Sequence, residues 1–71
     1  MDKAYLQKFA KHLKALRAEK GLTQDDLAAS DKISRSMISL LETARTDITL
    51  SKLKIIANAL GIHPRELLNF D

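Results

Sequence analysis

A cluster of small polar and cationic side chains, Ser34-Arg35-Ser36, stands where a short helix is expected to begin. Arginine and serine side chains at a helix tip can donate hydrogen bonds to base edges in the major groove of DNA. Around this cluster, residues 23–44 have the pattern of two short helices joined by a tight turn. The chemistry that the sequence offers here is therefore base recognition, provided that other elements hold the second helix in place.

Helical periodicity runs through almost the whole chain, and two glycines and one proline leave little room for strands and hairpins. Polar residues that can cap a helix precede the apolar stripes, and Gly21 and Gly61 follow two of them. We expect an all-α fold, a compact single domain of residues 1–71. Its five helices are expected at about residues 2–20, 24–31, 34–43, 50–60 and 64–69.

The composition argues against several other classes of protein. The chain has no cysteine and only two histidines, so we expect no disulfide and no metal site. No apolar stretch approaches the length of a membrane span, no signal peptide is evident, and we expect a cytoplasmic protein. Neither a glycine-rich phosphate loop nor the spacing of a catalytic triad is present. We therefore expect no enzyme activity, no cofactor and no small-molecule ligand.

Charge and aromatic content together favour duplex DNA as the partner. The net charge of +3 on 71 residues favours a polyanion. Proteins that bind single strands stack bases on several aromatic side chains, and this chain has only one tyrosine and two phenylalanines.

Short motifs stand in a fixed order from about residue 10 to residue 68. They are Leu22-Thr23-Gln24, Leu27-Ala28, Ile33-Ser34-Arg35-Ser36, Ile38-Ser39, Leu41-Glu42, Arg45 and Leu60-Gly61. Together they resemble the phage-repressor (Cro/repressor, xenobiotic-response-element type) helix-turn-helix domains. The stretch Arg45-Thr46-Asp47-Ile48-Thr49-Leu50 and the overall length are most similar to the restriction–modification controller proteins of that family. The resemblance implies a lambda-repressor-like DNA-binding domain with its helix-turn-helix motif at helices 2 and 3.

The resemblance also implies which side chains meet DNA. Base contacts are expected from the outward face of helix 3: Arg35, Ser36, Met37, Ser39 and Leu40. Phosphate contacts are expected near the ends of the two motif helices: Thr23, Gln24, Ser34, Arg45 and Thr46. Arg35 could donate two parallel hydrogen bonds to guanine O6 and N7. For Gln24, Ser36 and Ser39 the alternative is ordinary helix-start chemistry, and Leu40 either contacts a thymine methyl or packs against its own domain.

Other positions are expected to affect the fold and not the contacts with DNA. Family members often pair an arginine late in helix 1 with a glutamate late in helix 3, and Arg17 and Glu42 hold these positions. The chain departs from the family pattern at Asp31-Lys32 in the turn and at Ala44 after helix 3. A lysine in the left-handed region would cost roughly 1 kcal/mol, so this turn either differs from that of its relatives or is strained.

A chain this short hides only about 60% of the surface that its unfolded form exposes. We therefore expect a twofold-symmetric homodimer that buries the remaining apolar residues near the end of the chain: Ile48, Ile62, Leu67, Leu68 and Phe70. The two copies of helix 3, one from each subunit and about 34–36 Å apart, would then contact a palindromic operator on double-stranded DNA. The expected function is that of an autoregulatory transcription regulator of the controller type. The alternative is a protein-interaction module on the same fold, such as an antitoxin subunit or a bridging coactivator.

Overall fold

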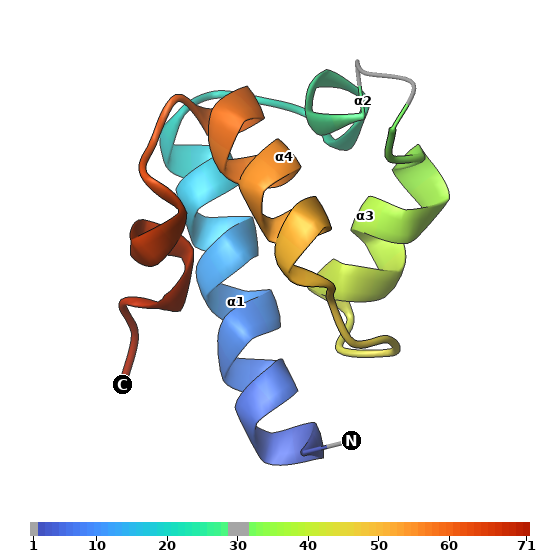
Figure 1. Cartoon of the computed structure of the whole chain (residues 1–71), viewed down its shortest axis with the longest axis vertical. Helices are drawn as coiled ribbons and strands as arrows, with labels where there is room; N and C mark the ends of the chain where they lie inside the picture. The colour runs from blue at the N-terminus through green and yellow to red at the C-terminus, as the bar shows by residue number, and fades with distance from the viewer. Residues whose placement is uncertain (1, 29–31) are drawn as a thin grey trace.

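The computed structural model describes residues 2–28 and 32–71 of the chain. These residues contain four α-helices and one 3-10 helix: α1 (Lys3–Glu19), α2 (Gln24–Leu27), α3 (Arg35–Glu42), α4 (Leu50–Leu60) and η1 (Pro64–Leu68). Figure 1 shows α1 along the length of the molecule, with η1 on one side of it and α2 and α3 on the other. In this part of the chain no strand is present, and no helix is long and apolar enough to cross a bilayer.

Each α-helix begins at a capping residue that the sequence predicts. A side-chain oxygen at each start accepts a hydrogen bond from the backbone N–H three residues later, and these capping residues are Asp2, Thr23, Ser34 and Thr49. A cap of this kind stabilises a helix by about 1 kcal/mol, because it satisfies a backbone donor that the helix itself leaves open. The starts of the four α-helices are thus specified locally.

The ends of α1 and α4 lie at glycines, whereas α3 ends at an alanine. Gly21 and Gly61 have φ of 69° and 72°, in the left-handed region where glycine meets no steric penalty. Ala44 adopts φ of 57°, which costs about 1–2 kcal/mol for an L-residue. Its methyl group is buried in a small cluster with Leu6 and Ala10 of α1, so the strain is offset in part by packing.

The prediction of five α-helices is wrong in one element. The segment expected as a helix at residues 64–69 is the five-residue 3-10 helix η1, in which the Glu66 N–H donates to the His63 carbonyl oxygen at 2.9 Å. It begins at Pro64, which has no N–H, and so short a segment gains little from the α-helical pattern. The expected helix at residues 24–31 is described only as far as Leu27, with a turn at Ala28, and its remaining residues 29–31 lie outside the described part.

The core takes side chains from every element. Its largest fully buried residues are Leu13 of α1, Leu27 of α2, Ile38 and Leu41 of α3, Ile56 of α4 and Leu67 of η1. Burying a leucine or isoleucine in this way stabilises the folded state by about 1.5–3 kcal/mol. Because α2 has only four residues, its attachment through Leu27 matters more than its own hydrogen bonds.

Leu67 and Leu68 are neighbours in sequence with opposite environments. Leu67 is fully buried in the core, whereas Leu68 is 44% exposed. The prediction that Leu67 belongs to a dimer surface is therefore wrong, because its side chain is already covered within this subunit. Sequence could not separate the two residues, since both are apolar and the segment is too short for a periodicity to show.

We expect Leu67→Ala to lower the free energy of unfolding by about 2–5 kcal/mol, because the truncation leaves a cavity in the core. The matched variant Leu68→Ala should lower it by about 1 kcal/mol or less, because that side chain is partly exposed. Urea denaturation followed by circular dichroism at a fixed protein concentration measures both. Equal losses for the two variants would contradict this placement of the core.

Candidate nucleic-acid interface

Helices α2 and α3 are attached to the core of the domain by apolar residues. Leu27 of α2, Ile33 before α3 and Ile38 within α3 are all buried in one core cluster. α2 also packs against α4, and α3 packs against α1. The opposite face of α3 is not covered by another element of the described part of the chain. The helix itself follows its capping residue, Ser34. The two helices are therefore fixed to the body of the domain while one face of α3 remains free for a partner.

The open face of α3 carries most of the side chains expected to contact bases. Arg35, Ser36, Ser39 and Leu40 are exposed, and Leu40 retains 39% of its accessible surface. The alternative in which Leu40 is packed into its own domain is therefore not the arrangement observed. Met37, by contrast, is partly buried and packs against the core, so it is the least available of the expected contacts.

A shallow hollow of about 240 Å³ lies between the start of α2 and the open face of α3. It is lined by Gln24, Arg35, Ser36 and Ser39, which the sequence places on the two motif helices. Its polar and cationic lining suits a phosphate group or the edge of a base. The structure thus brings together residues from both of the expected contact groups.

The starts of α2 and α3 already use several of their polar groups internally. The Thr23 N–H donates to Asp26 Oδ2 at 2.7 Å, and the Asp26 N–H donates to Thr23 Oγ1 at 3.1 Å, which forms a capping box. Ser34 Oγ accepts from the Met37 N–H at 3.0 Å. The backbone N–H of Thr23 is therefore not free for a phosphate, although the hydroxyl protons of Thr23 and Ser34 can still be donated.

The remaining residues expected at phosphates follow α3. Arg45 is exposed, and its backbone N–H donates to the Leu40 carbonyl oxygen at 2.9 Å, which helps to close the end of the helix. Thr46 is partly buried, and its hydroxyl donates to the Asp47 carbonyl oxygen at 3.3 Å. The expected strain at Asp31-Lys32 cannot be placed in the same way, because Asp31 lies outside the described residues.

A polar network behind this face joins three helices. The expected pair is confirmed: Arg17 Nε donates to Glu42 Oε2 at 2.6 Å, and Arg17 Nη2 donates to Glu42 Oε1 at 3.0 Å. Arg17 Nη1 also donates to the Leu22 carbonyl oxygen at 2.8 Å. Gln24 Nε2 donates to Glu42 Oε1 at 3.1 Å, a contact that sequence reasoning missed. One carboxylate of α3 thus holds α1 and the start of α2.

Burial and hydrogen bonding act in opposite directions on Glu42. Burial raises the pKa of this carboxyl group, but the hydrogen bonds from Arg17 and Gln24 outweigh it and hold the pKa below its ordinary value of 4.5. The same hydrogen bond raises the pKa of Arg17. Both groups of the pair are therefore charged at neutral pH, and a paired charge is the only kind that a protein interior tolerates well.

A second ion pair lies at the exposed edge of the motif. Arg35 Nε is 3.6 Å from Asp25 Oδ1, and both side chains are largely exposed. Asp25 is not among the residues that the sequence predicts at the DNA-binding surface. The signal that could have found the pair is the presence of opposite charges in the first turns of the two helices of one motif.

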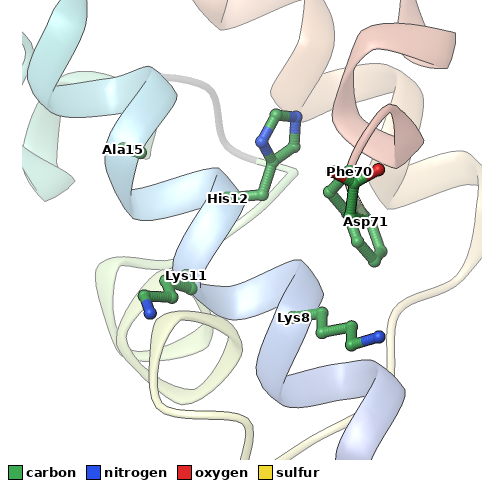
Figure 2. Close-up of a pocket in the computed structure, with 6 residues that line it drawn as sticks. All are labelled: Lys8, Lys11, His12, Ala15, Phe70 and Asp71. Carbon is green, nitrogen blue, oxygen red and sulfur yellow. The ribbon is translucent and has the colours of Figure 1, made fainter.

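The residues expected at a dimer surface lie around the C-terminal segment, apart from Ile48. Phe70 lies against Tyr5 and His12 of α1, with ring centroids 5.1 Å and 5.6 Å apart, and His12 Nε2 is 2.7 Å from the Glu66 carbonyl oxygen. Figure 2 shows His12 and Phe70 among the residues that line a hollow between α1 and the end of the chain. The volume of this hollow is about 440 Å³. Ile48, Ile62 and Phe70 pack partly against the core.

The described residues contain no group of histidine, cysteine, aspartate and glutamate side chains that could hold a metal ion.

Comparison with known proteins supports this arrangement. Residues 13–67 match a family model described as helix-turn-helix. The chain is 44% identical over 50 residues to the immunity repressor protein of Bacillus phage phi105, covering 70% of this chain and 35% of that protein. It is 38% identical over 61 residues to the HTH-type transcriptional regulator DdrOP3 of Deinococcus deserti, covering 86% and 47%. The chain thus spans about a third to a half of the length of these two relatives.

Solved structures of similar fold include a controller protein and a gene regulator. The restriction-modification controller protein C.AhdI from Aeromonas hydrophila superimposes with a TM-score of 0.85 at 39% identity, covering 90% of this chain and 97% of that one. The clp gene regulator ClgR from C. glutamicum superimposes with a TM-score of 0.80 at 28% identity, covering 90% and 83%.

The network around Glu42 predicts a specific pH dependence. Because the folded-state pKa of Glu42 is lowered, its stabilising contribution is complete above the unfolded value and is lost as the pH falls through the folded value. Glu42→Gln should lower the free energy of unfolding at pH 7 by about 1.5–3 kcal/mol, the range for hydrogen bonds to a charged group. It should also flatten the fall in stability below pH 4.5.

Urea denaturation at several pH values measures both effects. Asp26→Asn is the control, because Asp26 also has a lowered pKa, set by its hydrogen bonds with Thr23, and its removal should leave the contribution of Glu42 in place. Parallel stability curves for the wild type and Glu42→Gln would show that the network does not stabilise the fold through its charge.

Proposed function

The chain belongs to the helix-turn-helix family, and on this basis we propose that it is a transcription regulator that binds double-stranded DNA in a sequence-specific manner. The observation that carries the proposal is the exposed tip of α3. Arg35 stands there 67% exposed, at the edge of a hollow whose other lining residues are all polar. In the helix-turn-helix motif this N-terminal half of the second helix enters the major groove.

In the proposed complex, α3 lies in the major groove and Arg35 specifies a base pair. The terminal nitrogens of a guanidinium match guanine O6 and N7, and a good bidentate pair of this kind discriminates by about 1–3 kcal/mol. Ser36 and Ser39 donate to either base type. Leu40, which is exposed on the same helix, offers an apolar surface to a thymine methyl group.

Phosphate contacts position the domain on either side of the groove. We assign them to Gln24 and Thr23 at the start of α2, to Ser34, and to Arg45 and Thr46 after α3. Such contacts fix orientation and carry no sequence information, and the net charge of +3 favours them. Gln24 has a further N–H to donate, because among the described residues its amide makes one contact, to Glu42.

We further propose that the regulator is a homodimer that binds a palindromic operator and controls its own expression, as a controller-type protein. The C-terminal face supports this, because Leu68 is 44% exposed on η1 and Phe70 and Ile62 are only partly covered by the core. Ile48, which lies before α4 and apart from this face, is also only partly covered. To contact successive major grooves, two copies joined at the C-terminal face by a twofold axis need to hold their α3 helices about 34–36 Å apart.

Arg35→Ala tests the proposed recognition. Selection of duplexes from a random pool by the wild type should yield a consensus, and the variant should lose preference at one base pair of each half-site, by about 1–3 kcal/mol, while weak binding remains. Arg65→Ala is the matched control, because it removes a similarly exposed arginine from η1 and should leave the consensus unchanged. Absence of any mobility shift by the wild type at low salt would refute DNA binding.

Leu68→Glu tests the proposed dimer, because a carboxylate placed in an apolar contact loses its hydration without a partner. Sedimentation equilibrium should give a dimer for the wild type and a monomer for the variant, with an unchanged circular dichroism spectrum. Leu40→Glu is the control, because Leu40 is similarly exposed but lies on α3, and this variant should remain dimeric. A monomeric wild type, or a dimeric Leu68→Glu, would contradict the assignment.

A further inference from the structure

The ion pair between Asp25 and Arg35 connects the first turns of the two motif helices. Arg35 Nε lies 3.6 Å from Asp25 Oδ1, and the two side chains are 67% and 74% exposed. This distance is longer than a hydrogen bond from N–H to oxygen, which spans about 2.7–3.2 Å, so the contact is a charge contact with room to adjust. Neither side chain is buried, so packing does not explain the arrangement.

Asp25 differs in this respect from its neighbour in the same turn. Asp26 is committed to the capping box with Thr23, where it accepts the Thr23 N–H at 2.7 Å. The Asp25 side chain makes no hydrogen bond within residues 2–28 and 32–71, and its only charged partner there is Arg35. Two carboxylates in one turn would be unfavourable on a face that meets phosphates, unless one of them acts on a cation beside it.

The geometry of a guanidinium gives Asp25 a defined effect on Arg35. The carboxylate approaches the Nε edge of the group, and the other edge presents two terminal nitrogens. Those two nitrogens form the fork that matches guanine O6 and N7. A carboxylate at the Nε edge therefore restricts the side chain without occupying the atoms that recognise a base.

We propose that Asp25 is a positioning and specificity-determining residue for DNA recognition by Arg35, an inference that rests on the proposed DNA-binding function. Its carboxylate holds the Nε edge so that the fork faces a base. Its negative charge also repels a backbone phosphate that would otherwise take Arg35 in non-specific binding. Specificity rises because the contact of Arg35 with a backbone phosphate is weakened more than its contact with a base.

The experiment compares the wild type with Asp25→Asn, Arg35→Ala and the double variant. Glu19→Gln is the matched control, because it removes the same charge from an exposed position at the end of α1. Fluorescence anisotropy measures binding to two duplexes, one selected by the wild type from a random pool and one with the same composition in scrambled order. Thermal unfolding of each variant is measured alongside.

Asp25→Asn should bind the scrambled duplex more tightly and should lower the preference for the selected duplex by about twofold to fivefold, the range that exposed ion pairs allow. In the Arg35→Ala background the same substitution should leave the preference unchanged, because the residue acts through Arg35. Glu19→Gln should leave the protein's preference for the selected duplex over the scrambled duplex unchanged.

Three results would overturn the inference while leaving DNA binding intact. Glu19→Gln could change the preference as much as Asp25→Asn, which would make the effect one of net charge. The effect of Asp25→Asn could persist without Arg35, or it could be confined to a lower thermal stability, as expected of a residue that serves only the α2 dipole. If the wild type binds neither duplex at low salt, the proposed function fails, and this inference fails with it.

Discussion

The carboxylate of Glu42 is the group on which the arrangement of α1, α2 and α3 depends. It is nearly buried, and a buried charge is tolerated only where its hydrogen bonds are satisfied. Arg17 from α1 and Gln24 from α2 donate the hydrogen bonds that satisfy it. Desolvation offsets part of the attraction within such a pair, but removing one partner leaves the other charge without its counterion and is destabilising. The pair therefore fixes the geometry of the three helices.

The fixed geometry keeps the four-residue helix α2 in place beside α3. α2 is too short to be stable by itself, and it is held by Leu27 in the core and by Gln24 at the network. With α2 in place, the tip of α3 is left exposed beside it, and Arg35 meets Asp25 at the edge of the motif. The rigid interior thus determines where the exposed polar side chains stand.

Local chemistry made much of this predictable from sequence. The caps at Thr23, Ser34 and Thr49 specify where helices begin, and the apolar periodicity specifies which faces are buried. The rest depends on tertiary packing. The inward position of Leu67 leaves no mark in the local pattern, because it is decided by packing against other elements. The contact of Asp25 with Arg35 is suggested only by opposite charges in the first turns of the two motif helices, and it forms because tertiary packing brings those turns together.

We propose that the α2–α3 face, held by the Glu42 network, is the surface that contacts DNA. The most direct test is an NMR titration of the ¹⁵N-labelled protein with a duplex that the protein has selected. We expect the largest chemical-shift changes at the backbone amides of α3 and at the side-chain amide of Gln24, and no change at the backbone amide of Leu67. Changes concentrated in α1 and η1, with α3 unmoved, would contradict this proposal.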